Sequence, residues 1–183
     1  MSSPIQLIPL LCTRCQTTIP AEVDEVAWVC AQCGQGLLLD ETIGAVPLAV
    51  NFAAGIPANQ KGWPFWVVTG QVSVQKRSIF GGGDRGSETS QFWQASHRFF
   101  IPAFSAPLDQ LIGWGTRFLQ QPPALQPGPA AGFAPVTLHP EDLQPMAEFI
   151  VLGIEADRKD KVREIQFTVQ LGQPELWVLG LGK

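Results

Sequence analysis

The sequence predicts an α+β protein, in which a small N-terminal module precedes an antiparallel sheet with two helices on one face. Three observations support this prediction. All four cysteines lie in two Cys-x-x-Cys motifs within the first 33 residues. Near each end of the remaining chain, apolar and polar residues alternate with the period of a strand. Between these stretches, apolar residues recur twice with the period of a helix.

The N-terminal motifs are Cys12-Thr13-Arg14-Cys15 and Cys30-Ala31-Gln32-Cys33, separated by fourteen residues. Each motif presents two thiolates to one side of a tetrahedral ion, and the intervening segment is long enough for a hairpin that returns the second pair opposite the first. Short apolar runs at 26–29 and 37–39 flank the second motif. The pattern resembles a zinc ribbon over about residues 8–42. This resemblance implies that Zn²⁺ is bound by Cys12, Cys15, Cys30 and Cys33.

Other uses of the cysteines fit the sequence less well. A redox dithiol would need one motif in a βαβ context, and disulfides would need an oxidising compartment, yet no signal peptide precedes the cysteines. A catalytic metal needs an open ligand position, which four thiolates leave no room for. We therefore expect a structural zinc ion and a cytoplasmic location.

Charge is sparse and uneven. Charged residues make up 15% of the chain and hydrophobic residues 45%. Arg14 is the only basic residue among the first 60, against five acidic ones, which accounts for the net charge of −4. Nucleic-acid binding depends on basic residues near phosphates, so the composition disfavours it. No apolar run approaches the ~18 residues of a membrane-spanning helix.

We divide the chain into a zinc-ribbon module (1–44), a linker or connecting strand (45–60) and an α+β domain (61–183). Residues 66–75 alternate as a half-buried strand, residues 92–104 are expected to return as its partner, and the glycine-rich segment 81–87 would be the tip of this hairpin. A phosphate-binding loop is disfavoured, because it would lead into a helix and end in Gly-Lys-Ser/Thr.

Two helices and two strands follow. One helix is predicted from Leu108 to about Gln121, and a second begins at 139–142 and continues to Ile154. For the second helix, a single turn followed by a strand over 149–154 is an alternative, because Pro145 and β-branched residues weaken the helical pattern. The proline-rich stretch 120–135 is an ordered crossing loop or a linker. Residues 165–171 and 176–181 are predicted to form a closing hairpin, and the second run, apolar on both parities, is central in the sheet or buried against a neighbour.

The sequence offers little catalytic chemistry. His97 and His139 are isolated, no Gly-x-Ser-x-Gly motif occurs, and the carboxylates have the pattern of solvated charges. We therefore predict a non-enzymatic, zinc-stabilised interaction or assembly subunit that binds another protein or itself. The alternatives are a nucleic-acid-binding zinc-ribbon accessory protein and an enzyme with an unmarked pocket. Four tryptophans are either interface anchors or core residues: Trp63, Trp66, Trp114 and Trp177.

Overall fold

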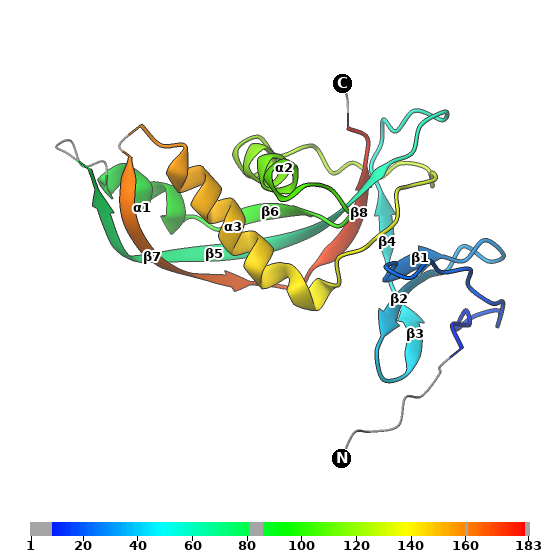
Figure 1. Ribbon diagram of the computed structural model, residues 1–183. Helices are drawn as coiled ribbons and strands as arrows, with labels where there is room; N and C mark the ends of the chain where they lie inside the picture. Colours follow the sequence, from blue (N-terminus) through cyan, green and yellow to red (C-terminus); the bar gives the residue numbers. More distant parts are fainter. Residues whose placement is uncertain (1–8, 81–85, 160, 182–183) are drawn as a thin grey trace, which may run out of the picture.

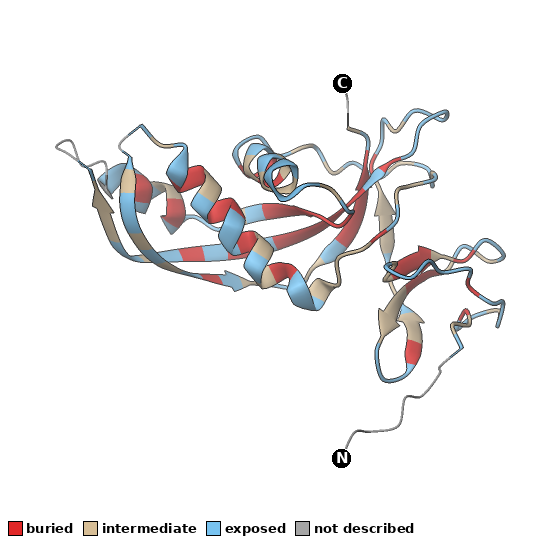
Figure 2. Ribbon diagram, in the orientation of Figure 1, coloured by how far each residue is buried: buried red, intermediate tan, exposed pale blue. Residues whose placement is uncertain are grey.

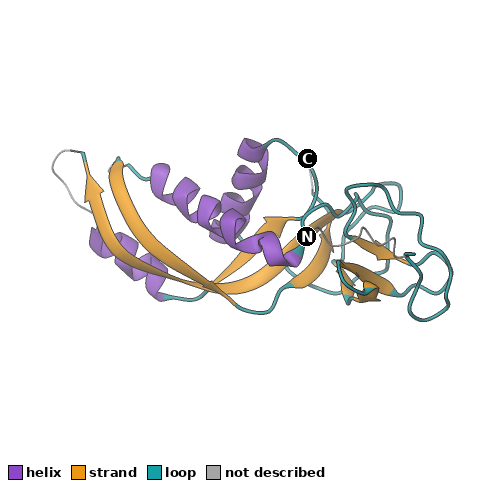
Figure 3. Ribbon diagram, turned by 60° about the horizontal axis from the view of Figure 1, so that its bottom comes forward, coloured by secondary structure: helices purple, strands orange, loops and turns teal. Residues whose placement is uncertain are grey.

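The computed structural model describes residues 9–80, 86–159 and 161–181. It is an α+β protein, as predicted, and the cysteine motifs lie with a small sheet at one end of a longer sheet (Figures 1 and 3). In chain order the elements are β1 (Ala27–Val29), β2 (Gly36–Asp40), β3 (Gly44–Pro47), β4 (Val50–Phe52), β5 (Trp63–Ile79), α1 (Gly86–Gln94), β6 (His97–Pro102), α2 (Leu108–Gln120), the 3₁₀ turn η1 (Pro140–Asp142), α3 (Leu143–Ala156), β7 (Val162–Leu171) and β8 (Glu175–Leu179).

Strand β5 is the centre of the longer sheet. Its first half lies between β8 and β6, so that Phe65 is opposite both Trp177 and Pro102. From Gly70 onward it pairs with β7. Residues 65–68 are buried without alternation, whereas the side chains of 71–75 alternate between exposed and buried or half-buried positions (Figure 2). Where β5 has a strand on each edge, side chains on both of its faces are buried. Where, among the described strands, it pairs with β7 alone, one face is exposed, and there the alternation with a period of two appears.

The predicted hairpin between the last two strands is wrong. β7 and β8 are both antiparallel to β5, so they point in the same direction and do not face each other. β7 and β8 follow one another along the same edge of β5, and residues 172–174 form the short break between them. Within this break, the Gly172 amide donates to Thr69 O of β5 at 2.8 Å. β8 lies between β5 and β4, and β4 is parallel to it. Its apolar residues are thus central in the sheet, which explains why both parities are apolar.

Residues 86–94 form helix α1, which the sequence analysis missed by assigning 92–104 to a strand. Thr89 and Trp93, one helical turn apart, are both buried, and Trp93 belongs to the main core. The sequence analysis extended the alternating strand pattern back to Trp93, but the strand itself begins at His97, the first residue of β6. Five residues of the predicted glycine-rich tip, 81–85, lie outside the described part of the chain. The expectation that a strand follows this segment is wrong, because a helix does.

Helices α2 and α3 confirm the helical predictions, and the strand alternative for 149–154 is wrong. The two helices lie against each other over the sheet (Figure 3). Their close approach requires glycine, since a Cβ on Gly115 would overlap the Ile150 side chain, and one on Gly153 would lie 2.9 Å from Ile112 Cγ2. The face of α3 toward the sheet is buried, and its opposite face exposes Phe149 and Leu152.

The proline-rich stretch between α2 and η1 is an ordered crossing segment. It makes isolated bridges to three separate parts of the fold, pairing Pro127 with Ala53, Phe133 with Gly62 and Val136 with Ala27. The Thr137 amide also donates to Ala103 O at 2.7 Å. This segment therefore connects the cysteine-bearing sheet to the longer sheet, although it has almost no regular structure.

A buried carboxylate links α1, β5 and α3. Glu155 is 1% exposed, and its Oε1 accepts from Trp93 Nε1 at 2.8 Å and from Arg158 Nε at 2.7 Å. Its Oε2 accepts from Arg77 Nε at 3.0 Å. The prediction that the carboxylates are solvated is wrong for this residue. Its desolvation is offset by two guanidinium groups and an indole N–H.

We predict that Glu155→Ala lowers the free energy of unfolding by about 3–5 kcal/mol, because it removes the carboxylate that compensates buried donors and guanidinium charge. Urea denaturation followed by tryptophan fluorescence measures the change. Glu148→Ala, at an exposed position of the same helix, is the control and should change stability by less than about 0.5 kcal/mol. Equal effects of the two substitutions would contradict a structural role for the buried network.

Candidate metal centre

Both cysteine motifs fold into the same turn. The amide of the first cysteine donates to the carbonyl five residues later, and its carbonyl accepts from the amide four residues later. These distances are 2.9 and 2.9 Å at Cys12, and 2.8 and 2.8 Å at Cys30. The residue after each second cysteine, Gln16 or Gly34, has a positive φ of 60° or 72°. The left-handed residue reverses the chain so that both thiols of a motif face the same side.

The two turns place four sulfur atoms around one point. The Sγ atoms of Cys12 and Cys33 are 3.5 Å apart, those of Cys15 and Cys30 are 3.6 Å apart, and all four lie within 4.8 Å of one another. A tetrahedral ion with metal–sulfur bonds of about 2.3 Å would separate its sulfur ligands by about 3.8 Å. The four predicted ligands are therefore together and could bind a metal ion.

Hydrogen bonds favour thiolates at one side of the cluster. The Thr17 hydroxyl lies 3.2 Å from Cys15 Sγ, and this contact, with the Thr17 amide, lowers the pKa of Cys15 to about 6. The Cys15 amide lowers the pKa of Cys12. The Gln35 amide also favours the Cys33 thiolate, but burial and the neighbouring thiols outweigh it and raise the pKa of Cys33 to about 12. Four thiolates this close together repel one another, so that bringing them together costs free energy unless a cation lies between them. A bound metal ion would supply that positive charge.

The small sheet has one face toward the sulfurs and one toward the rest of the protein. We call residues 10–47, which contain β1–β3 and both cysteine turns, the cysteine module. Trp28 and Leu37, paired across β1 and β2, pack in a cluster with Cys12 and Cys30. The next pair, Ala27 and Leu38, packs against the main core. Alternation along two short strands thus places the sulfur cluster on one face of the small sheet and the body of the protein on the other.

Two polar contacts hold this interface. The Val26 amide donates to Val136 O at 2.8 Å. His139 Nε2 lies 3.0 Å from Leu39 O, and its Nδ1 accepts from the Glu141 amide at 3.3 Å, which caps η1. With Nδ1 as acceptor, Nε2 carries the proton and donates to Leu39. His139 lies at a helix start, as predicted, and in addition it binds the cysteine module, which its sequence position did not indicate.

The remaining candidate residues have structural surroundings. His97 Nε2 lies 2.8 Å from Phe92 O, and its ring stacks on that of Phe92 with centroids 4.5 Å apart. Among the four predicted anchors or core residues, Trp66 and Trp177 are buried. Trp114 is half-buried against Phe118, and Trp63 is 38% exposed.

We compared the chain with protein-family models, curated proteins and solved structures, and none of them matched it. Within the described residues, we found no helix with the length and hydrophobicity that crossing a bilayer requires.

We predict that Cys30→Ser prevents metal binding and unfolds the cysteine module, because binding energy at such a site is largely folding energy. Metal content measures the first effect, and hydrogen exchange of the amides in 26–39 measures the second. Gln32→Ser, at an exposed position inside the same motif, is the control and should bind metal normally. A Cys30→Ser protein with full metal content and protected amides would contradict the four-thiolate site.

Proposed function

We propose that this chain is a non-enzymatic, zinc-stabilised interaction or assembly subunit. The observation that carries the proposal is the cluster of four sulfurs within 4.8 Å. Thiolate ligands in a tetrahedral arrangement favour zinc, and four of them complete the shell, so the ion would have a structural role. Four unpaired thiols at this site would suit a reducing compartment, and a cytoplasmic location is part of this proposal.

Two observations support a binding role over catalysis. His97 is occupied by the Phe92 carbonyl and ring, and its described contacts include no carboxylate. In contrast, Phe149 and Leu152 are each 41% exposed and lie one turn apart on the outer face of α3. Contiguous exposed apolar side chains favour a protein contact site, and these two residues form the contiguous apolar pair on which we base the binding role.

The alternative of a nucleic-acid-binding accessory protein is disfavoured by charge. Arg14 is the only basic residue among the first 60, and four thiolates with one Zn²⁺ would add a formal charge of −2 to the same module. An acidic module of this kind would repel a phosphate backbone.

We predict that protein purified without chelators contains about one zinc per chain, as a four-thiolate site requires. Inductively coupled plasma mass spectrometry gives the stoichiometry. Removal of the ion should unfold the cysteine module, and Zn²⁺, but not Mg²⁺, should restore it, because Mg²⁺ prefers oxygen ligands. Protein that contains iron in place of zinc, with the visible absorption of iron–thiolate bonds, would contradict the zinc assignment.

We predict that Phe149→Asp abolishes recovery of the partner or of the self-associated form, because it places a charge in the contact. Affinity purification from the native host with mass spectrometry, together with light scattering of pure protein, measures both kinds of association. Gln110→Asp adds the same charge at an exposed position of α2 and should leave association unchanged. A monomer without a protein partner that binds DNA or RNA in a salt-dependent manner would favour the alternative.

A further inference from the structure

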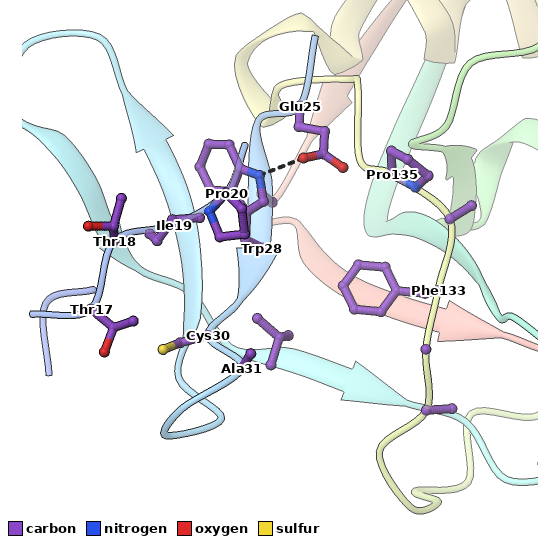
Figure 4. A pocket seen from close by; sticks show the side chains of 15 residues that line it. Thr17, Thr18, Ile19, Pro20, Glu25, Trp28, Cys30, Ala31, Phe133 and Pro135 are labelled. Carbon is purple, nitrogen blue, oxygen red and sulfur yellow. Dashed lines mark hydrogen bonds between the residues drawn. The ribbon is translucent and has the colours of Figure 1, made fainter. Parts of the chain in front are cut away.

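A cavity of about 370 Å³ lies between the cysteine module and the crossing segment, and ligand sites of this size are common in proteins. One wall is formed by residues 17–20 and 27–31, and the other by residues 131–135 (Figure 4). Most of the side chains that line it are apolar, and the bulky ones are Ile19, Pro20, Trp28, Phe133 and Pro135.

The cavity opens beside the outer edge of β1, which the crossing segment occupies at Val26 and Ala27 but, among the described contacts, not at Val29. Among the described strands, β1 is an end strand of the order β1-β2-β3, and its outer edge makes one isolated bridge, from Ala27 to Val136. Beyond this bridge the two walls diverge. The Cys30 amide donates to Gln35 O on the β2 side at 2.8 Å. Since peptide groups alternate in direction along a strand, those of Val29 point to the outer edge, where Val29 lines the cavity.

The opposite wall is already held by the body of the protein. The Gly62 amide donates to Gly132 O at 2.8 Å, and the Ala134 amide donates to Gly62 O at 3.0 Å. These bonds fix the backbone that carries Phe133. The cavity is therefore preformed, with one fixed apolar wall and one strand edge that can accept another strand.

The charge around the cavity is negative. Glu25 lines it, and its Oε2 accepts from Trp28 Nε1 at 3.0 Å (Figure 4). The same oxygen also accepts from the Glu22 amide at 3.0 Å. Glu22 and Asp24 are exposed beside it. A carboxylate held in place at the edge of an apolar cavity favours a ligand that combines apolar side chains with positive charge.

We infer that this cavity binds an extended segment of a partner protein, in which basic and apolar residues alternate and which adds as a strand to the outer edge of β1. This inference rests on the proposed interaction function and adds a second contact surface to the one on the outer face of α3, with the chemistry of the partner segment that would bind there. The apolar side chains of the added strand would enter the cavity between Trp28 and Phe133. The long basic side chains would reach the carboxylates at its rim, those of Glu25, Glu22 and Asp24.

The probe is a fluorescein-labelled nine-residue peptide in which lysine and valine alternate, and the matched control peptide has glutamate in place of lysine. Anisotropy titrations of the zinc-loaded full chain should show saturable binding of the basic peptide and none of the acidic one. Glu25→Gln should weaken binding about two- to fivefold, the range of a partly exposed ion pair. Glu41→Gln, which removes the same charge from the exposed turn after β2, should not.

A second measurement tests strand addition without changing the protein. Two versions of the basic peptide are N-methylated at alternate residues, in the two possible phases. One phase should abolish binding, because it removes the peptide N–H groups that would bond to the β1 edge, and the other should retain it. Equal loss in both phases, binding of the acidic peptide, or no binding of the basic peptide would overturn the inference. In that case, recovery of a protein partner from the host would still support the proposed function at another surface.

Discussion

The hydrogen-bonded edges of β5 are the constraint on which the rest of the fold depends. Near its start the strand is bonded on both edges, so Phe65 and Trp66 are buried on opposite faces of the sheet and belong to two different hydrophobic clusters. Past Gly70 the described strands include a partner on only one edge, and α1 packs near β5 in this region. The chain therefore forms a sheet with two packed faces at one end and a narrower two-stranded arm at the other.

The cysteine module depends on the same alternation at a smaller scale. A small sheet with few buried residues has little stability by itself, and a metal ion and an adjoining core are two ways of supplying it. Trp28 and Leu37 face the sulfurs, whereas Ala27 and Leu38 face the main core. A metal ion held by the sulfurs would thus act on one face of this sheet, and the contacts with the main core act on the other, so that β1 and β2 connect the two.

The sequence predicted those features whose signals are local. Cysteine spacing predicted which four thiols lie together, and helical periodicity predicted α2 and α3. Helix α1 was missed because Trp93, Ala95 and His97 also fit the period of a strand. The predicted closing hairpin was wrong. Gly172 and Pro174 have the composition of a hairpin turn, but here they form a short break between β7 and β8, which both lie along the same edge of β5. Glu155 bonds to Trp93, which lies 62 positions earlier in the chain, and to Arg77, which lies 78 positions earlier. No pattern in a single sequence shows such a network, because only the tertiary fold brings its members together.

The crossing segment has a consequence for conformational entropy. An irregular segment that bridges three parts of a fold must be ordered without the cooperative bonds of a helix or sheet, at a cost of roughly 1–2 kcal/mol per residue. Five of the sixteen residues in 120–135 are prolines. Proline restricts the unfolded chain, so less freedom is lost when the segment becomes ordered. The prolines thus exclude a helix or strand from this segment. They also lower the free-energy cost of ordering it along its path between the two sheets.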